Sequence, residues 1–496
     1  MSPSVDPFNE AKYEALMDGL DFQEINKSEI ENGFTLGAEY YGQKYVEAVK
    51  KVELCKSTQP LGKMWMLMTD GDHGSPDYQD SGVLYLLSES IEEGYINTAK
   101  CRYITVEKNN ELKRSCLHPG DIVVTKTGVY FGKSAVIPET IPEANTIAHV
   151  GKITLKEQYN PYYVSTFLNS KYGYYQMRRR GIKATRPEIK LVEFPEILVP
   201  LFSHSFDLKI EKLIREGISV INESFLHIKK CEKFLMSVLN LDISNINQQP
   251  SPCISECSLS HSLFSSGRLD AEYYQTKYDK YLSALHKFTT TSLPEEFEVF
   301  KNVGTNYADG ISDIGVIKTK QLTNTGLNIE SIESYFTNED CVHNKSTFIS
   351  KNDVIFASMG VGSLGKVSLF SYEGDKQFVT DSTLRIYRAK ETTRVLPEVL
   401  CIFLQSPVGQ ELIYRYVVGS TGIINIYDED IAKIPIPVLD MSIQKDIAEK
   451  LQESFALRHQ AKLLLEYAKR AVEMAIEQGE DVALEWVKNI IPDQEV

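Results

Sequence analysis

Apolar residues recur at steps of three and four along two long stretches of the chain, separated by Lys, Glu and other polar residues. The first stripe is Ile210, Ile214, Ile218, Ile221, Phe225, Ile228, Cys231, Leu235 and Leu239, and the second is Ile443, Ile447, Leu451, Phe455, Ala461, Leu464, Ala468, Val472 and Ala475. This period predicts two long amphipathic helices suited to helix–helix packing. A helix over 206–239 would be about 51 Å long. Two matched helices of this length indicate a spacer between globular domains, with surface left over for a partner.

Short β-branched runs outside these stripes stop at glycine, which is typical of strands followed by turns. The runs DIVVTKTG from Asp121 and DVIFASMG from Asp353 are each followed by a second strand pattern, SAVIP and KVSLF. Residues 162–168 and 398–404 favour short helices. The chain is therefore predicted to have a mixed α+β fold.

The same landmarks occur twice in the same order. The tetrapeptide AEYY begins at Ala38 and again at Ala271, and Gly-Lys pairs occur at 132–133 and 365–366, both at an offset of 233. The segments NPYYVSTFLNS from Asn160 and LPEVLCIFLQS from Leu396 match at an offset of 236, and each copy ends in one of the long helices. This order predicts a tandem duplication.

Composition narrows the class of protein. The chain has 496 residues, of which 42% are hydrophobic and 24% charged, close to globular averages. No apolar run is long enough to span a membrane, and the N-terminus lacks the pattern of a secretory signal. Eight scattered cysteines fit a reducing compartment. We therefore expect a soluble cytoplasmic protein.

Charge is unevenly distributed along the chain. The net charge is −15, but residues 1–33 and 473–496 each contribute −6, while the segment 171–190 carries +6. A local basic strip can bind phosphate on an acidic protein because salt confines electrostatic interactions to about 10 Å. Taken alone, the strip is more typical of a solvated helix face and loop.

Several short motifs approach known catalytic patterns without completing them. The GxxxxGK spacing at 360–366 is followed by Val367 rather than Ser or Thr, so a triphosphate loop is not expected. Asn160-Pro-Tyr-Tyr lacks the second proline of the methyltransferase motif, and Pro76-Asp77 with Glu111-Leu-Lys113 matches a nuclease pattern too loose to be informative. Cys253, Cys257 and His261 lack a fourth zinc ligand nearby. Two duplicated domains without a catalytic constellation favour a bivalent reader over an enzyme.

The duplicated order of landmarks resembles the specificity (S) subunit of type I restriction–modification systems. In each copy the order is AEYY, a strand–glycine–GK loop, FLNS or FLQS, a proline-bounded strand and a long helix. The resemblance implies two tandem target-recognition domains separated by two long antiparallel helices, and a double-stranded DNA target in two parts with a gap. It implies a non-catalytic subunit without a cofactor of its own. S-adenosylmethionine is expected on two partner adenine methyltransferase subunits, and ATP and magnesium on a motor-nuclease subunit where one exists.

The resemblance also sets the expected domain boundaries. The predicted parts are an acidic N-terminal extension, a first target-recognition domain, a first spacer helix, an exposed linker, a second target-recognition domain, a second spacer helix and an acidic tail. Their bounds are 1–33, 34–202, 203–241, 242–266, 267–439, 440–477 and 478–496.

Candidate DNA-binding residues lie in the glycine loop and in the polar segment after FLNS or FLQS, because Arg, Asn, Ser, Thr and Lys are the side chains that contact bases and phosphates. In the first copy they are Lys126, Lys133, Arg178, Arg179, Arg180, Lys183, Thr185 and Arg186; in the second they are Ser358, Lys366, Arg415, Tyr416, Ser420, Thr421 and Asn425. The helix residues predicted to bind partners are Ile214, Ile221, Phe225, Ile228, Ile447, Leu451, Phe455 and Leu464. The alternative is a non-catalytic scaffold whose two duplicated domains bind proteins.

Overall fold

The computed structural model describes Tyr13, Leu16, Ile25 and residues 38–181, 186–241, 256–304, 307–308, 312–323, 326–419 and 424–490. The chain divides into two compact units. Unit 1 comprises Met1–Val220 and Gln460–Val496, and unit 2 comprises Ile221–His459. The long helices α6 (His204–Val238) and α15 (Met441–Gln478) each contribute one part to each unit. Unit 1 is therefore built from both ends of the chain.

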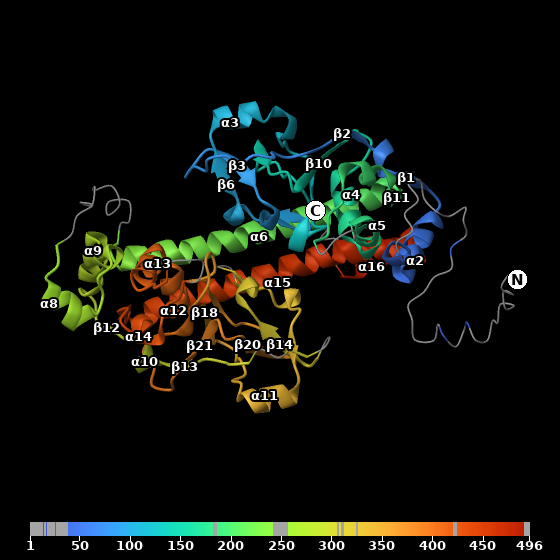
Figure 1. Ribbon diagram of the computed structural model, residues 1–496. Helices are drawn as coiled ribbons and strands as arrows, with labels where there is room; N and C mark the ends of the chain where they lie inside the picture. The colour runs from blue at the N-terminus through green and yellow to red at the C-terminus, as the bar shows by residue number, and fades with distance from the viewer. Residues whose placement is uncertain are drawn as a thin grey trace, which may run out of the picture. The chain divides into compact units, whose positions relative to one another are not determined.

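The strands of unit 1 form four small sheets (Figure 1). The largest has the order β2 (Trp65–Asp70), β10 (Val150–Leu155), β7 (Ile122–Thr125) and β8 (Ser134–Val136), with all neighbours antiparallel. A second sheet has the order β6 (Arg102–Ile104), β3 (Val83–Leu86) and β9 (Ala144–Thr146), in which β3 and β9 are parallel. The pairs β1 (Thr58–Pro60) with β11 (Leu198–Pro200) and β4 (Ile91–Glu92) with β5 (Tyr95–Ile96) complete the set.

Unit 2 has the same four sheets in the same strand order. Its largest sheet runs β13 (Phe297–Phe300), β21 (Leu384–Ala389), β18 (Val354–Ala357) and β19 (Val367–Leu369), again antiparallel. The second runs β17 (Tyr335–Phe336), β14 (Ile314–Ile317) and β20 (Gln377–Thr380), with β14 and β20 parallel. The pairs are β12 (Thr290–Thr291) with β22 (Ile436–Pro437) and β15 (Leu322–Thr323) with β16 (Gly326–Leu327). This correspondence is what the predicted duplication requires.

Each unit also contains shorter helices. Unit 1 contains α2 (Gln43–Glu53), α3 (Val106–Glu111), α4 (Pro161–Asn169), α5 (Lys171–Gly181) and α16 (Glu480–Ile490). Unit 2 contains α8 (Leu259–His261), α9 (Thr276–Leu285), α10 (Leu293–Glu296), α11 (Asn338–Asn344), α12 (Pro397–Gln405), α13 (Pro407–Arg415) and α14 (Asp428–Ile431). The AEYY tetrapeptides form the 3₁₀ helices η2 (Ala38–Tyr41) and η10 (Ala271–Tyr274).

The core of unit 1 joins the sheet, α4 and α5 to both long helices. Phe206, Ile210 and Ile214 of α6 are buried in the same cluster as Ala468 and Val472 of α15. The two helices approach closely at Gly217, where an added Cβ would lie 3.0 Å from Leu465 Cδ2. Helix α16, within the predicted acidic tail, buries Ala483 and Val487 in this core.

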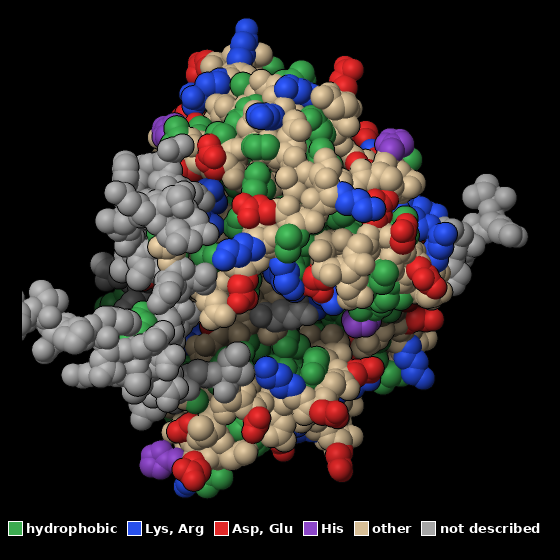
Figure 2. All heavy atoms as spheres, turned by 90° about the vertical axis from the view of Figure 1, so that its right-hand side faces the viewer, with side chains coloured by type: hydrophobic (Ala, Val, Ile, Leu, Met, Phe, Trp, Pro, Cys, Tyr) green, Lys and Arg blue, Asp and Glu red, His purple; other side chains and the backbone are tan. Residues whose placement is uncertain are grey.

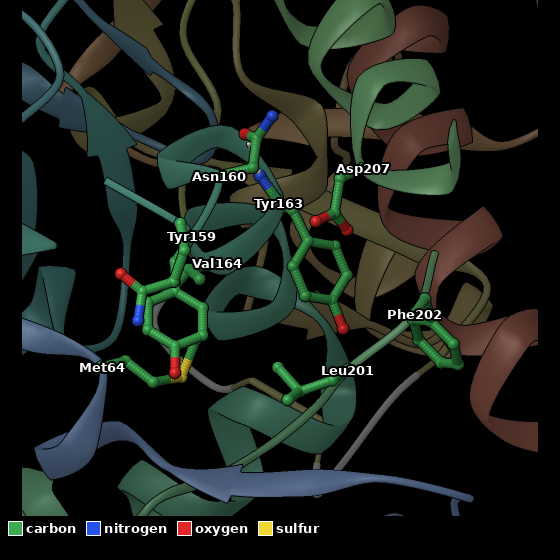
Figure 3. A pocket seen from close by; sticks show the side chains of 9 residues that line it. Met64, Tyr159, Asn160, Tyr163, Val164, Leu201, Phe202 and Asp207 are labelled. Atoms are coloured by element: carbon green, nitrogen blue, oxygen red, sulfur yellow. Dashed lines mark hydrogen bonds between the residues drawn. The ribbon is translucent and has the colours of Figure 1, made fainter. Parts of the chain in front are cut away.

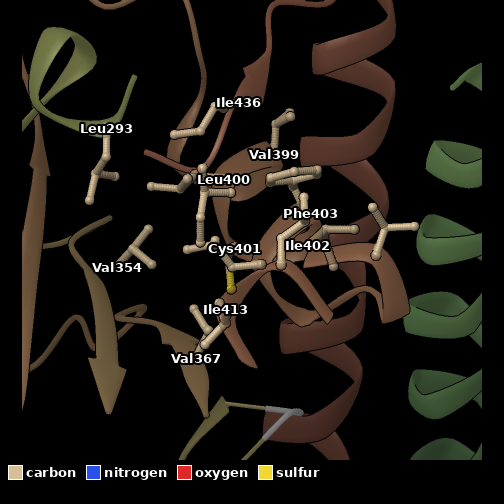
Figure 4. Close-up of a cluster of buried hydrophobic side chains, with 14 of the residues drawn as sticks. Leu293, Val354, Val367, Val399, Leu400, Cys401, Ile402, Phe403, Ile413 and Ile436 are labelled. Carbon is tan, nitrogen blue, oxygen red and sulfur yellow. The ribbon is translucent and has the colours of Figure 1, made fainter. Parts of the chain in front are cut away.

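Unit 2 has its own core, in which α12 packs on the sheet (Figure 4). Here the two long helices are linked by buried hydrogen bonds: Ser224 and Ser454 lie 3.0 Å apart between their Oγ atoms, and Arg458 Nε donates to Ser224 Oγ at 2.9 Å. The pairing of 224 with 454 and of Cys231 with the Ile447 carbonyl shows that these parts run antiparallel. A buried polar contact of this kind fixes the helix register.

The mixed α+β class and the long helices predicted from the sequence are confirmed. The predicted strand pairs are β7 with β8 and β18 with β19, and the two predicted short helices are α4 and α12. Of the predicted linker 242–266, residues 242–255 lie outside the described residues. Among the residues described, no helix is both long enough and apolar enough to cross a bilayer.

Candidate nucleic-acid interface

The glycine loop and the polar segment of unit 1 meet in the structure. The Lys126 carbonyl accepts a hydrogen bond from Ile189 N at 3.0 Å, and Gly128 N donates to the Pro187 carbonyl at 2.9 Å. The same pairing occurs in unit 2, where the Ser358 carbonyl accepts from Ile426 N at 3.0 Å and Gly360 N donates to Ile424 at 2.9 Å. Two segments about 60 residues apart in sequence therefore form one site in each unit.

Gly128 allows an arginine to lie directly over the loop backbone. It has a φ of +82°, and an added Cβ would lie 3.1 Å from Arg186 Nε and 3.2 Å from Nη2. A side chain here would be strained by the positive φ and would displace the guanidinium. Arg186 is exposed, so the loop presents a cation to solvent at this point.

Five of the predicted DNA-binding side chains, Tyr416 and the four described next, are buried, which corrects their assignment. Lys126 is 8% exposed, and its Nζ lies 2.9 Å from Asp70 Oδ2. Arg179 and Arg180 are buried, and Ser358 Oγ donates to the Thr383 carbonyl at 2.9 Å. These groups hold the loop and the segment in place instead of facing solvent.

The shared AEYY motif is explained by the arginine that it contacts. The Arg179 guanidinium lies 4.2 Å from the centre of the Tyr40 ring in unit 1, and that of Arg415 lies 4.6 Å from the Tyr273 ring in unit 2. Each contact is a cation–π interaction between the first tyrosine of the motif and the end of the helix before the polar segment. The repeated AEYY tetrapeptide marks the tyrosine of this contact in the sequence, but it does not indicate which arginine the tyrosine contacts.

The other predicted DNA-binding residues are partly exposed, buried or outside the described residues. Lys133 forms an ion pair with Glu92, and the Arg178 guanidinium lies 5.9 Å from the centre of the Phe131 ring. Tyr416 is buried. Partial exposure is found at Lys366, Arg415 and Asn425, whereas Lys183, Thr185, Ser420 and Thr421 lie outside the described residues.

Sequence analysis missed a set of charged residues around Lys126. Asp70 Oδ1 lies 3.2 Å from Arg114 Nη2, and Asp70 Oδ2 lies 3.4 Å from His73 Nε2. Burial alone raises the pKa of Asp70, but the hydrogen bond and charge of Lys126, with the charges of His73 and Arg114, lower this pKa below its usual value. Asp70 is thus an anion shared by the Lys126 ammonium and the Arg114 guanidinium, with the His73 imidazole beside it. No local pattern marks this set, because Arg114 and Lys126 are 44 and 56 residues from Asp70.

The helix residues predicted to bind partners face the interior instead. Ile214, Ile221, Ile447, Leu451 and Leu464 are buried, and Phe225, Ile228 and Phe455 are partly buried. The prediction that this stripe is a partner surface is therefore wrong for the buried five. Their burial follows from the pairing of α6 with α15 in each unit.

A small cavity of about 140 Å³ lies in unit 1 between α4 and the start of α6 (Figure 3). Asn160 borders it and acts as the N-cap of α4, accepting hydrogen bonds from Tyr162 N and Tyr163 N. This cap accounts for the Asn-Pro-Tyr-Tyr motif. Burial, with the charge of nearby Glu480, raises the pKa of Asp207 to about 7.

Residues of the remaining near-miss motifs have structural roles. Glu111 forms an exposed ion pair with Lys108, and Gln410 Nε2 donates to the carbonyl of Gly365 in the second GK loop. Cys253 lies outside the described residues. Within the described part of the chain, His, Cys, Asp and Glu side chains do not gather in groups that could hold a metal ion.

Comparison with known proteins gives the following matches. Residues 300–466 match the family model for the type I restriction modification DNA specificity domain. No curated protein matches the chain at a significant level.

Solved structures similar to this chain include the S subunit of a type I restriction–modification system from M. genitalium, with 11% identity, 88% of this chain and 96% of that chain covered, and a TM-score of 0.31. The HsdS subunit from Thermoanaerobacter tengcongensis has 11% identity, 85% and 97% coverage and a TM-score of 0.29. A chain from a study of assembly and conformational transition of the type I R-M system has 12% identity, 86% and 97% coverage and a TM-score of 0.27.

The family model covers β21, β18 and β19 of the largest sheet of unit 2, together with α12, α13 and most of α15. The matched residues include the loop and polar segment of unit 2. That family is a DNA-recognition family without catalytic chemistry, in agreement with the expectation from the sequence. The resemblance predicted from the sequence is thereby confirmed: residues 300–466 of this chain match the type I restriction modification DNA specificity domain.

Proposed function

We propose that this chain recognises a double-stranded DNA target in two parts separated by a gap, and directs adenine methyltransferase subunits to it. The observation that carries the proposal is the repetition of one architecture. Unit 2 contains most of the match to the DNA specificity domain, and unit 1 has the same strand order and the same pairing between glycine loop and polar segment. One unit would read each half of the target.

The two candidate interfaces differ in chemistry, which supports different half-targets. In unit 1 the loop carries Arg186 over Gly128, whereas in unit 2 Asn425 pairs by backbone with both Met359 and Val418. Arginine is suited to guanine and phosphate, and asparagine to adenine. The two halves would then read unlike sequences.

The test is to co-express the chain with the DNA methyltransferase encoded beside it and to sequence host DNA for methylated adenine. A new motif in two parts with an unspecified gap is the expected result. Exchanging residues 45–200 with those of a related chain should change one half of the motif, and exchanging 278–437 should change only the other half. A single undivided motif, or one exchange that changes both halves, would contradict the proposal.

Partner binding is proposed on the outward sides of the long helices, because their apolar stripes are buried. Leu226 of α6 is 50% exposed and lies beside the buried Ser224. Leu226→Glu is expected to weaken co-purification of the methyltransferase, while the exposed Glu223→Gln serves as a control on the same helix. Methyltransferase subunits would supply S-adenosylmethionine, and a nuclease subunit, where one exists, ATP and magnesium.

The scaffold alternative is favoured by the net charge of −15. It predicts co-purification of partner proteins without any methylation motif and without affinity for DNA. The co-expression experiment therefore separates the two proposals directly.

A further inference from the structure

The buried pair of Lys126 and Asp70 leaves one cation uncompensated in unit 1. Asp70 is 10% exposed and carries one negative charge, which Lys126 neutralises at 2.9 Å. Arg114 contacts the other carboxylate oxygen at 3.2 Å, but 64% of its side chain remains exposed. Its charge is therefore held in place by the sheet and still available to a ligand.

Arg114 lies at the same end of the sheet as the glycine loop. Asp70 is the last residue of β2 and pairs with Gly151, and Thr125 is the last residue of β7 and pairs with Val150. Because Gly151 and Val150 are neighbours on β10, β2 and β7 end together, and Lys126 continues from there into the loop. The exposed guanidinium of Arg114 thus belongs to the edge of the sheet that also carries Arg186.

This arrangement is not repeated in unit 2. Ser358 replaces Lys126 as the residue after the central strand, and Arg385 occupies the position of Gly151. Arg385 is only 7% exposed, and its Nε lies 2.7 Å from Asp428, so its charge is buried and matched. The units differ in overall charge as well: residues 38–200 have 21 Lys and Arg against 19 Asp and Glu, and residues 271–437 have 16 against 21.

Resting on the proposed DNA-binding function, we propose that Arg114 is a phosphate-contacting residue of unit 1 and that Asp70 is its positioning residue. An arginine guanidinium binds phosphate oxygens through paired N–H donors, and one nitrogen of Arg114 is already oriented by Asp70. Phosphate contacts fix the register of a protein on DNA without reading its sequence. Unit 1 would then supply more of the salt-dependent affinity than unit 2.

The test is the salt dependence of DNA binding by the full chain. Fluorescence anisotropy would be measured with two labelled duplexes of unrelated, arbitrary sequence over a series of salt concentrations. Because each phosphate contact contributes about 0.9 to the slope of log K against log salt, Arg114→Ala should reduce this slope by about 0.9 on both duplexes. Arg114→Lys retains the charge and should retain the slope.

Lys156→Ala is the matched control, since Lys156 is an exposed cation just beyond the opposite end of β10. It should leave the slope unchanged. A slope in Arg114→Ala equal to that of the wild type, or a loss confined to one of the two duplexes, would overturn the inference alone. A wild-type chain without salt-dependent affinity for either duplex would overturn the proposed function and the inference together.

Discussion

Replacement of Asp70 by Asn tests whether the buried charge set stabilises unit 1. In the wild type, the Lys126 ammonium is 8% exposed and lies 2.9 Å from the carboxylate of Asp70. Asp70→Asn keeps the shape but leaves this ammonium without a counter-ion. Removing one partner of a buried ion pair costs about 3–5 kcal/mol, and we expect a loss near the lower end because Asn can still accept a hydrogen bond.

The reverse substitution should be milder. Lys126→Met removes the buried cation, but the Asp70 carboxylate keeps Arg114 at 3.2 Å and His73 at 3.4 Å. We expect a loss of about 1.5–2 kcal/mol, at the lower end of the range for a lost charged hydrogen bond. The double variant should be more stable than the sum of the two single losses predicts, because it contains no unpaired buried charge.

Tryptophan fluorescence during urea unfolding measures these losses of unfolding free energy in unit 1, where the substitutions lie. Both tryptophans of the chain, Trp65 and Trp486, belong to unit 1 and pack against its core. Glu111→Gln breaks the exposed ion pair with Lys108 and should cost less than about 0.5 kcal/mol. A loss in Lys126→Met equal to or larger than that in Asp70→Asn, or simple additivity in the double variant, would refute the reasoning.

The pKa of Asp70 gives the same pair a dependence on pH. Its folded pKa lies below the unfolded value, so the stability it contributes is present above the unfolded pKa and is lost as the pH falls through the folded pKa. The difference in stability between the wild type and Asp70→Asn should therefore shrink in acid. A difference in stability that stays the same in acid would show that packing, and not charge, is responsible for the loss in Asp70→Asn.

Three further perturbations have defined outcomes. Tyr273→Leu removes the cation–π contact with Arg415 and should cost about 0.5–2 kcal/mol in urea unfolding followed by circular dichroism, whereas Tyr273→Phe keeps the ring and should be nearly neutral. Asp207→Asn should match the wild type in thermal stability near pH 4 and exceed it at pH 8. Burial raises the folded pKa of Asp207 to about 7, so the ionised carboxylate destabilises the wild type as the pH rises from 4 to 8. Equal stabilities of the two proteins at pH 8 would contradict this expectation. Gly217→Leu should cost about 1–3 kcal/mol by tryptophan fluorescence, since even a Cβ at this position lies 3.0 Å from Leu465, and an unchanged midpoint would show that the helices can move apart.

The local elements and their repetition could be predicted from the amino-acid sequence alone. The strand patterns became β7 with β8 and β18 with β19, and the two apolar stripes became α6 and α15. These features are set by period and by turn residues, which act over a few neighbouring positions. The offset of 233 between the AEYY tetrapeptides likewise anticipated two units with one strand order.

The charges and apolar residues that remain available to a partner depend on the tertiary fold and could not be predicted from local patterns. In the sequence, Lys126 and Arg179 are cationic residues that no local pattern marks as buried. In the fold, Lys126 is buried against Asp70, 56 positions away, and Arg179 is buried against Tyr40, 139 positions away. Arg114 lies in a segment without a sequence motif, and its guanidinium remains exposed. The stripes of α6 and α15 bury one another for the same reason: burial depends on contacts between distant segments, and periodicity shows that a helix has an apolar face without showing what covers it.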